Sequence, residues 1–358
     1  MTTPLAREIA AEIAADGPIS IARYMARCLG DPRHGYYTTR IPFGQDGDFV
    51  TAPEVSQVFG ELIGAWLIAA WEDQGAPSPV RLVELGPGRG TLMADILRVA
   101  RLRPGFLQAT HVDLVETSPR LRDAQRDRLA DAPCPITWHE RIEEVPGGPA
   151  FVVANEFFDA LPIRQFMRTE TDWHERVIGL DDTGALAFGL GPARLDDAAL
   201  TGLPSAQPGT ILERQPIADA IMATLATRIA TEGGALLAID YGYLRPGFGD
   251  TLQAVKSHAY APVLETPGEA DLTAHVNFAA LAGAAECSGA VAHGPMTQAA
   301  FLLALGLVER AQKLAAGKDD TAFATLEAAL NRLAGAEEMG ELFKVLAVTS
   351  PGIRPPPF

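Results

Sequence analysis

The segment VRLVELGPGRGTLMADILRVA, residues 80–100, constrains the fold more than any other part of the chain. A short β-rich run ends in glycines at alternate positions, and a helical pattern follows directly. The same alternation recurs downstream, because HVDLVE (111–116) precedes a helix that opens at Pro119, and PAFVVANE (149–156) forms a third strand. Strands and helices that alternate across short loops predict an α/β fold, a doubly wound parallel sheet with crossover helices.

The whole chain divides into four predicted regions. Residues 1–75 are predicted to form an N-terminal helical cap with a lid loop, and residues 76–163 the first half of the core. Residues 164–232 read as an insertion with a hairpin and a helix. Residues 233–358 are expected to complete the core with loop-rich and helical additions, since GGALLAIDYG (233–242) and KVLAVT (344–349) are typical of buried strands.

Charge and composition exclude several classes of function. The chain of 358 residues has a formal net charge of −16, which disfavours a nucleic-acid binder because such proteins need a basic surface. Its longest strongly apolar run, 62–71, is about half of the ~20 residues that a membrane span requires. Three separate cysteines and widely spaced histidines indicate neither a disulfide framework nor a metal site. A small molecule or a basic protein segment remains as the partner, and cytoplasm is the expected location.

Gly86, Gly88 and Gly90 follow the first predicted strand. Glycines allow a sharp turn and a close approach of the backbone to a ligand. The dinucleotide fingerprint GxGxxG would need glycine where this chain has Thr91. Glu84 suits a cofactor with a cationic amino-acid end, which favours S-adenosylmethionine over NAD. The alternative is an ordinary strand–helix turn.

Glu116 ends the second predicted strand, and Thr117 follows it. An acidic side chain at this position of a doubly wound sheet can accept hydrogen bonds from both ribose hydroxyls of a nucleotide. The alternative is a carboxylate that interacts with the dipole of the next helix. The upstream glycines and Glu84 favour ribose binding.

The stretch NEFFDALP (155–162) follows the third strand directly. Because ligands bind beyond the carboxyl ends of the strands in open α/β sheets, Asn155, Glu156 and Asp159 are expected to face the site. Two carboxylates beside aromatic rings could hold a guanidinium and orient one of its nitrogens toward a methyl donor. The alternative is a helix N-terminus with acidic caps.

Six stretches together resemble the MidA family of class I methyltransferases, whose mitochondrial members are complex I assembly factors. They are HGYY (34–37), GDFVTAPE (47–54), VELGPGRGTLMADILR, VETSP, NEFFDALP and PGEADLTAHVNF (267–278). The resemblance runs in order over nearly the whole chain. It implies a Rossmann-like class I methyltransferase fold and cofactor roles for Gly86, Gly88, Gly90 and Glu116. It also implies that the protein forms symmetric dimethylarginine on a core subunit of complex I.

The loop GDFVTAPE holds Asp48, Thr51 and Glu54 between glycine and proline residues. Such a polar loop can close over a cofactor site as a lid that excludes water. In the alternative, it is a surface loop in which Thr51 caps the following helix. His34 and Tyr36 line the same pocket in one interpretation and form a packed surface cluster in the other.

Asp240 and Tyr241 end a predicted central strand and should face the cleft. His275 lies in a polar stretch and could accept a proton, since the pKa of a free histidine is about 6.5. The combined interpretation is a protein arginine methyltransferase with an inserted substrate-recognition region, in which Glu156, Asp159 and His275 are the catalytic candidates. A small-molecule methyltransferase and a non-catalytic assembly chaperone are the alternatives.

Overall fold

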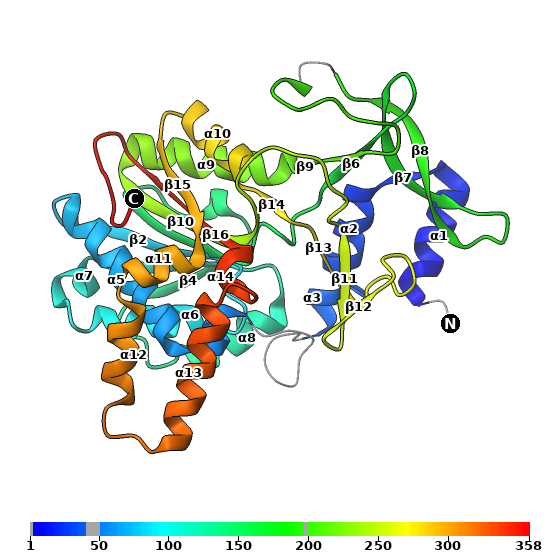
Figure 1. Cartoon of the computed structure of the whole chain (residues 1–358). Coiled ribbons are helices and arrows are strands. Elements are labelled where there is room, and N and C mark those ends of the chain that lie inside the picture. The colour runs from blue at the N-terminus through cyan, green and yellow to red at the C-terminus, as the bar shows by residue number, and fades with distance from the viewer. Residues whose placement is uncertain (1–2, 41–50, 197–199) are drawn as a thin grey trace.

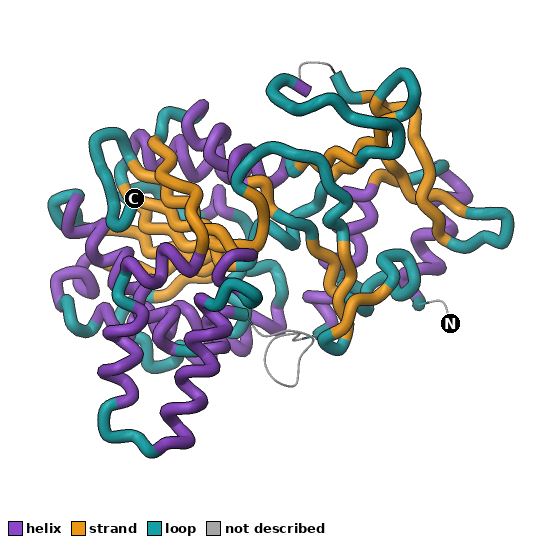
Figure 2. Tube along the Cα trace, viewed as in Figure 1, coloured by secondary structure: helices purple, strands orange, loops and turns teal. Residues whose placement is uncertain are grey.

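The computed structural model describes residues 3–40, 51–196 and 200–358, which form a larger and a smaller lobe (Figure 1). The larger lobe is built on an eight-stranded sheet whose main path runs β15-β16-β10-β5-β2-β3-β4, while β14 pairs with β10. Its strands are β2 (Val80–Leu85), β3 (Thr110–Val115), β4 (Ile136–His139), β5 (Ala150–Asn155), β10 (Gly234–Tyr243), β14 (Val276–Asn277), β15 (Val291–Thr297) and β16 (Phe343–Thr349). Figure 2 shows these strands gathered in one layer between helices.

The strand directions confirm the predicted doubly wound fold. β4, β3, β2, β5 and β10 pair in parallel, and only β16 runs antiparallel to both of its neighbours. The chain moves outward from β2 through β3 to β4 and then returns to place β5 on the other side of β2. Ligands of such sheets bind at this reversal, beyond the carboxyl ends of the strands.

Alternate strand residues face two hydrophobic layers, which explains the near-continuous apolar runs of the sequence. Leu82 and Phe151 face the layer that contains α5 and α6, whereas Val83 and Val152 face α9 and α10. The helices of this lobe are α4 (Ala52–Val55), α5 (Gln57–Asp73), α6 (Thr91–Ala100), α7 (Pro104–Ala109), α8 (Pro119–Arg128), the 3-10 helix η1 (Ile142–Glu144), α9 (Pro216–Glu232) and α10 (Phe278–Cys287). Within the described residues, no helix is long and apolar enough to cross a bilayer.

The smaller lobe brings together three distant parts of the chain. It contains α1 (Pro4–Asp16), β1 (Ile19–Ser20), α2 (Ile21–Gly30), α3 (Tyr36–Thr39), β6 (Arg164–Arg168), β7 (Trp173–Leu180), β8 (Leu186–Arg194), β9 (Ile211–Arg214), β11 (Gln253–Lys256), β12 (Ala259–Ala261) and β13 (Asp271–Thr273). β1 pairs with β7 through Ile19 and Ile178, so the N-terminal cap and the insertion share one sheet. A common hydrophobic cluster adds Leu272 from β13.

This packing divides the chain differently from the predicted regions. α5 lies within residues 1–75, yet Trp66 and Leu67 are buried in the core of the large sheet. α9 lies within the predicted insertion, yet Met222 and Leu225 pack against the opposite face of that sheet. Both helices are long apolar segments, and only a sheet face offers them enough apolar surface to cover.

The C-terminal additions follow β15 and lie beside α4 and α5 of the larger lobe. They are α11 (Gln298–Ala304), α12 (Leu307–Ala315), α13 (Asp320–Ala334) and α14 (Met339–Leu342). α12 and α13 project from the lobe as a helical hairpin, drawn orange to red in Figure 1.

Candidate active site

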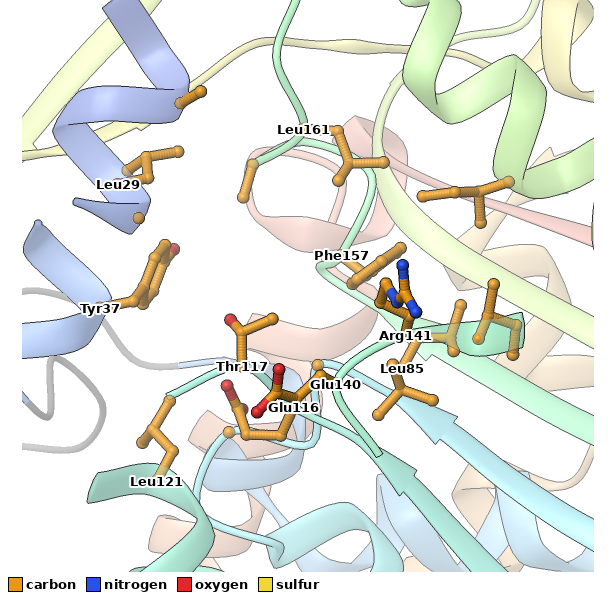
Figure 3. Close-up of a pocket in the computed structure, with 18 of the residues that line it drawn as sticks. Leu29, Tyr37, Leu85, Glu116, Thr117, Leu121, Glu140, Arg141, Phe157 and Leu161 are labelled. Carbon is orange, nitrogen blue, oxygen red and sulfur yellow. The ribbon is translucent and has the colours of Figure 1, made fainter. Parts of the chain in front are cut away.

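A cavity of about 520 Å³ lies between the two lobes, at the carboxyl ends of β2, β3 and β5. Figure 3 shows Leu29 and Tyr37 from the smaller lobe on one side, facing Glu116 and Thr117 of the larger lobe. Of the residues predicted from the sequence, five line the cavity: Gly86, Gly88, Glu116, Thr117 and Glu156. The cavity therefore lies at the chain reversal of the sheet, where a nucleotide cofactor is expected.

The glycine loop takes a path that other residues adopt with difficulty. Gly86, Gly88 and Gly90 have φ angles of 61°, 53° and 78°, in the left-handed region that favours glycine. A Cβ atom on Gly86 would lie 3.0 Å from the ring of Phe157. The glycines thus serve both the turn and the close packing of the loop against the NEFFDALP segment.

Gln125 of α8 holds this loop, and the sequence analysis did not identify it. Its Nε2 donates to the carbonyl oxygen of Gly88 (2.8 Å) and to Oε2 of Glu116 (3.3 Å). Its Oε1 accepts from Nε1 of Trp138 (2.9 Å). The side chain is fully buried. A glutamine in a charged helix carries little sequence signal, and only the fold brings it between the two cofactor motifs.

Glu116 makes a local capping contact, and its predicted role in ribose binding stays a prediction. Its Oε1 accepts from the backbone N–H of Ser118 (2.7 Å), a local cap at the start of α8, and the side chain also lines the cavity. Burial raises the pKa of Glu116, although the N–H of Ser118 and the amide of Gln125 lower it. The carboxylate is thus held in place by its neighbours while it faces the ligand space.

Glu84 is a buried acid with an unsatisfied oxygen. Its side chain is 3% exposed, and Oε2 has no hydrogen-bond partner in the described part of the chain. Burial, together with the nearby carboxylates of Asp95 and Glu116, raises the pKa of Glu84 to about 8. Oδ1 of Asn155, at the end of β5, is also buried without a partner. Neither Glu84 nor Asn155 lines the cavity, but each directly precedes a residue that does, Leu85 or Glu156. Unpartnered buried acceptors in these positions suit the ammonium group of S-adenosylmethionine.

Glu156 has a left-handed backbone with a φ of 50°. Its Oε1 accepts from the backbone N–H of Ala52 at the start of α4 (3.0 Å) and from Nδ2 of Asn155 (3.1 Å). Burial raises the pKa of Glu156 to about 7, an effect that the N–H of Ala52 opposes and Asp159 reinforces. The carboxyl group therefore holds its proton more tightly than an exposed glutamate does.

Asp159 lies three residues beyond Glu156 and is buried; it does not line the cavity itself, although the next residue, Ala160, does. Its Oδ2 accepts from the hydroxyl of Tyr241 (2.5 Å), whereas Oδ1 is buried without a partner. Burial raises the pKa of Asp159 to about 6, although the hydroxyl of Tyr241 lowers it. Asp240 does not line the cavity; its Oδ2 accepts from the backbone N–H groups of residues 157–159 instead.

The predicted lid is only partly described. Asp48 lies outside the described residues. Thr51 occupies the N-cap position of α4, but its hydroxyl makes no capping hydrogen bond. Glu54 accepts from the hydroxyl of Thr91 (3.2 Å) and lies 3.6 Å from Nη1 of Arg89. Glu54 thus joins α4 to the glycine loop, and α4 in turn contacts Glu156 through the N–H of Ala52.

Of the HGYY residues, Tyr37 lines the cavity and the two predicted ones do not. Nε2 of His34 lies 3.5 Å from Oε1 of Glu8 on α1. Tyr36 is fully buried in the core of that lobe. The hydroxyl of Tyr37 donates to Oδ1 of Asp271 (2.9 Å). Adjacent aromatic residues at a helix start point in different directions, and the sequence alone did not show which one faces the ligand.

His275 also lies away from the cavity lining. Its ring packs edge-on against Tyr241, with ring centroids 5.5 Å apart. Burial lowers the pKa of His275, and the charge of Lys344 lowers it further. The imidazole is therefore neutral at pH 7 and stands behind the tyrosine that contacts Asp159.

Comparison with known proteins connects this geometry to a family. Residues 62–296 match the family model described as an S-adenosyl-L-methionine-dependent methyltransferase. The chain is 40% identical to the mitochondrial protein arginine methyltransferase NDUFAF7 of Danio rerio, with 96% of this chain and 86% of that protein covered. It is 36% identical to the Homo sapiens protein of the same name, with 97% and 83% covered.

A solved structure from Burkholderia thailandensis, bound to S-adenosyl-homocysteine, matches with a TM-score of 0.85 and 32% identity. The match covers 96% of this chain and 91% of that one. These similarities confirm the predicted class I methyltransferase fold and S-adenosylmethionine as the cofactor. The chain belongs to the MidA family of S-adenosyl-L-methionine-dependent methyltransferases, as its sequence motifs predicted.

Proposed function

We propose that this protein methylates arginine side chains of another protein. The observation that carries the proposal is a pair of carboxyl groups at the carboxyl end of β5: the half-buried Glu156, which lines the cavity, and the buried Asp159. Their raised pKa values mean that each gains from a cation placed beside it. A guanidinium supplies that charge in a planar group suited to carboxylate oxygens. The curated relatives are named protein arginine methyltransferases, which supports this substrate class.

Two pairs of acidic residues would bind the cofactor and orient the methyl acceptor, respectively. S-adenosylmethionine, when bound, supplies an electrophilic methyl group on a sulfonium centre. Glu84 would hold its ammonium group, and Glu116 its ribose hydroxyls. Glu156 and Asp159 would orient one guanidinium nitrogen, and the unpartnered Oδ1 of Asp159 can accept a hydrogen bond or the proton that this nitrogen releases. Positioning and electrostatics should supply most of the acceleration, because methyl transfer is an in-line displacement.

We further propose that the product is symmetric dimethylarginine and that the substrate is a core subunit of complex I during its assembly. This rests on the resemblance to the MidA family, whose organellar members act in complex I assembly. The relatives' names place them in mitochondria, as expected for organellar members of the family. For this chain we propose the cytoplasm, the location expected from the sequence.

Transfer of a labelled methyl group from S-adenosylmethionine into an extract of a strain that lacks the gene tests the proposal. Acid hydrolysis and amino-acid analysis of the labelled protein then identify the product. Symmetric dimethylarginine in one protein band is the expected result. Label confined to small molecules would favour a small-molecule methyltransferase. Tight binding of S-adenosylhomocysteine without any label in extract or assembling complex would indicate a non-catalytic assembly chaperone.

Glu156→Gln separates substrate orientation from cofactor binding. The variant keeps the shape of the side chain and the bond to the N–H of Ala52, but it loses the negative charge. We expect methyl transfer to fall about 100-fold or more, the scale of losing one electrostatic group at a reacting centre. The affinity for S-adenosylhomocysteine should stay within about twofold. Equal losses of both would contradict the assignment.

A further inference from the structure

The last residues of β10 contact the turn that carries the two acids. Asp240 is fully buried. A single oxygen, Oδ2, accepts from the backbone N–H groups of Phe157 (3.2 Å), Phe158 (3.0 Å) and Asp159 (3.2 Å). Three consecutive N–H groups around one carboxyl oxygen form an anion-binding concavity. Burial and the carboxyl groups of Asp159 and Glu156 raise the pKa of Asp240 well above its ordinary value, whereas the N–H of Asp159 lowers it.

This contact explains how Glu156 keeps a left-handed backbone. A non-glycine residue remains in that region only when its surroundings impose it. The N–H of Glu156 donates to the carbonyl oxygen of Ile239 (2.9 Å), so β10 holds the turn on both sides of the strained residue. The second contact is the one made by Asp240, the next residue after Ile239, with the N–H groups of residues 157–159.

Tyr241 controls the other acid. Its hydroxyl donates to Oδ2 of Asp159, while Oδ1 remains buried without a partner. The tyrosine therefore fixes the rotation of the carboxyl group and leaves one oxygen for a ligand. Tyr241 is itself held from behind, since its ring packs edge-on against the rings of His275 and Phe343.

We infer that Asp240 and Tyr241 are positioning residues for the methyl acceptor: Asp240 shapes the turn, and Tyr241 orients Asp159 and favours its ionised form. This inference rests on the proposed function, because a guanidinium is the group that Asp159 would orient. Neither residue needs to touch the cofactor. Their position on β10 explains why Asp240 and Tyr241 occur in a central strand whose preceding residues, 234–239, are all small or apolar.

The titratable groups around Asp159 come from its own turn and from three other elements. They are Glu156 in the same turn, Asp240 and Tyr241 on β10, Tyr37 on α3 and Asp271 on β13, with His275 and Lys344 behind Tyr241. Among these groups, the hydroxyl of Tyr241 is the one that donates directly to Asp159. Its removal should therefore raise the pKa of Asp159 above about 6.

Thermal unfolding of Tyr241→Phe tests this without any catalysis. A buried carboxyl with a raised pKa lowers stability as pH rises from its unfolded-state pKa to its folded-state pKa, and a still higher folded-state pKa lowers stability more. The loss in melting temperature of Tyr241→Phe relative to the wild type should be larger at pH 8 than at pH 5. Tyr243→Phe is the matched control, because Tyr243 lies on the same strand and bonds Asn277 instead. Its loss should not change with pH.

Measurements of kcat test the same roles, with the full-length protein, labelled S-adenosylmethionine and the protein that accepts the methyl group. Tyr241→Phe should move the acid limb of the kcat profile to higher pH, while Tyr243→Phe should not. Asp240→Asn should lower kcat about 10-fold or more and leave the affinity for S-adenosylhomocysteine within about twofold. Asp240→Glu, which keeps the carboxyl group but lengthens the side chain, replaces it if the asparagine variant does not fold.

The outcomes separate this inference from the proposed function. Equal and pH-independent losses of melting temperature in both phenylalanine variants would overturn the role of Tyr241, and so would an unshifted kcat profile. Unchanged kcat in a folded Asp240 variant would overturn the role of Asp240. Failure of the wild-type protein to methylate any arginine would overturn the proposed function, whereas the melting temperatures would still decide whether Tyr241 controls Asp159.

Discussion

Replacing Glu84 with glutamine tests the cofactor site most directly. The carboxyl group is 3% exposed, its Oε2 lacks a partner, and burial raises its pKa to about 8. In the free protein at pH 6.5, this group is therefore mostly protonated. Binding an ammonium group favours the ionised form, so cofactor binding should release a proton from Glu84.

The free-energy cost of ionising Glu84 follows from the difference between its pKa and the pH. At pH 6.5, ionising Glu84 costs about 2 kcal/mol, and the cost vanishes above about pH 8. The affinity for S-adenosylhomocysteine should therefore tighten about tenfold between pH 6 and pH 7. Without ligand, the same raised pKa makes stability fall as pH rises from 4.5 toward 8. In Glu84→Gln both pH dependences should disappear, and affinity at pH 7.5 should fall about 10- to 100-fold through loss of a charged hydrogen bond.

Isothermal titration calorimetry in two buffers of different ionisation enthalpy measures the released protons. We expect about one proton per bound ligand at pH 6.5 for the wild type and close to none for Glu84→Gln. Asp95→Asn is a useful control, because Asp95 raises the pKa of Glu84 while its own carboxylate pairs with Arg98. It should keep most of the affinity and release fewer protons at pH 7. A Glu84→Gln variant that still releases one proton, with wild-type affinity, would refute the reasoning.

Three further predictions follow from contacts in the structure. Gln125→Leu removes the bridge between Gly88 and Glu116 and should weaken S-adenosylhomocysteine binding about tenfold by calorimetry; unchanged affinity would remove its role. Gly234→Ala should yield no folded protein in solubility and circular dichroism tests, because a Cβ there would lie 2.0 Å from a backbone oxygen. His275→Ala should lower methyl transfer far less than the ~100-fold expected for a general base, since the ring stands behind Tyr241; a larger loss would restore that role.

The main elements of the large lobe could be predicted from local patterns. The run 80–85, the glycine turn and the helix from Thr91 were predicted where the structure has them, and α8 begins at Pro119 with Ser118 as its cap. Each depends on neighbouring residues, because apolar periodicity, glycine freedom and helix caps are short-range effects. For Glu116 the sequence left two roles open, because an acidic residue suits both the start of a helix and the binding of ribose hydroxyls.

The lobe organisation needed long-range pairing. β1 joins β7 through Ile19 and Ile178, which are far apart in the chain, and α5 covers the large sheet instead of the cap. No local pattern distinguishes a helix that covers one apolar face from a helix that covers another. The boundaries predicted at residues 75 and 232 followed changes in composition, whereas the packing follows where apolar surface is available.

The sequence by itself determined the family, the cofactor class and the acids at the strand ends, because these depend on residue types at fixed spacings. Only the tertiary structure decided which of those groups act together. It turned Asp240 toward the backbone of residues 157–159, linked Tyr241 to Asp159 and placed Tyr37 rather than Tyr36 in the cavity. The direction of a side chain and the pKa of a buried carboxyl depend on burial and on partners from distant strands, which spacing along one segment does not contain.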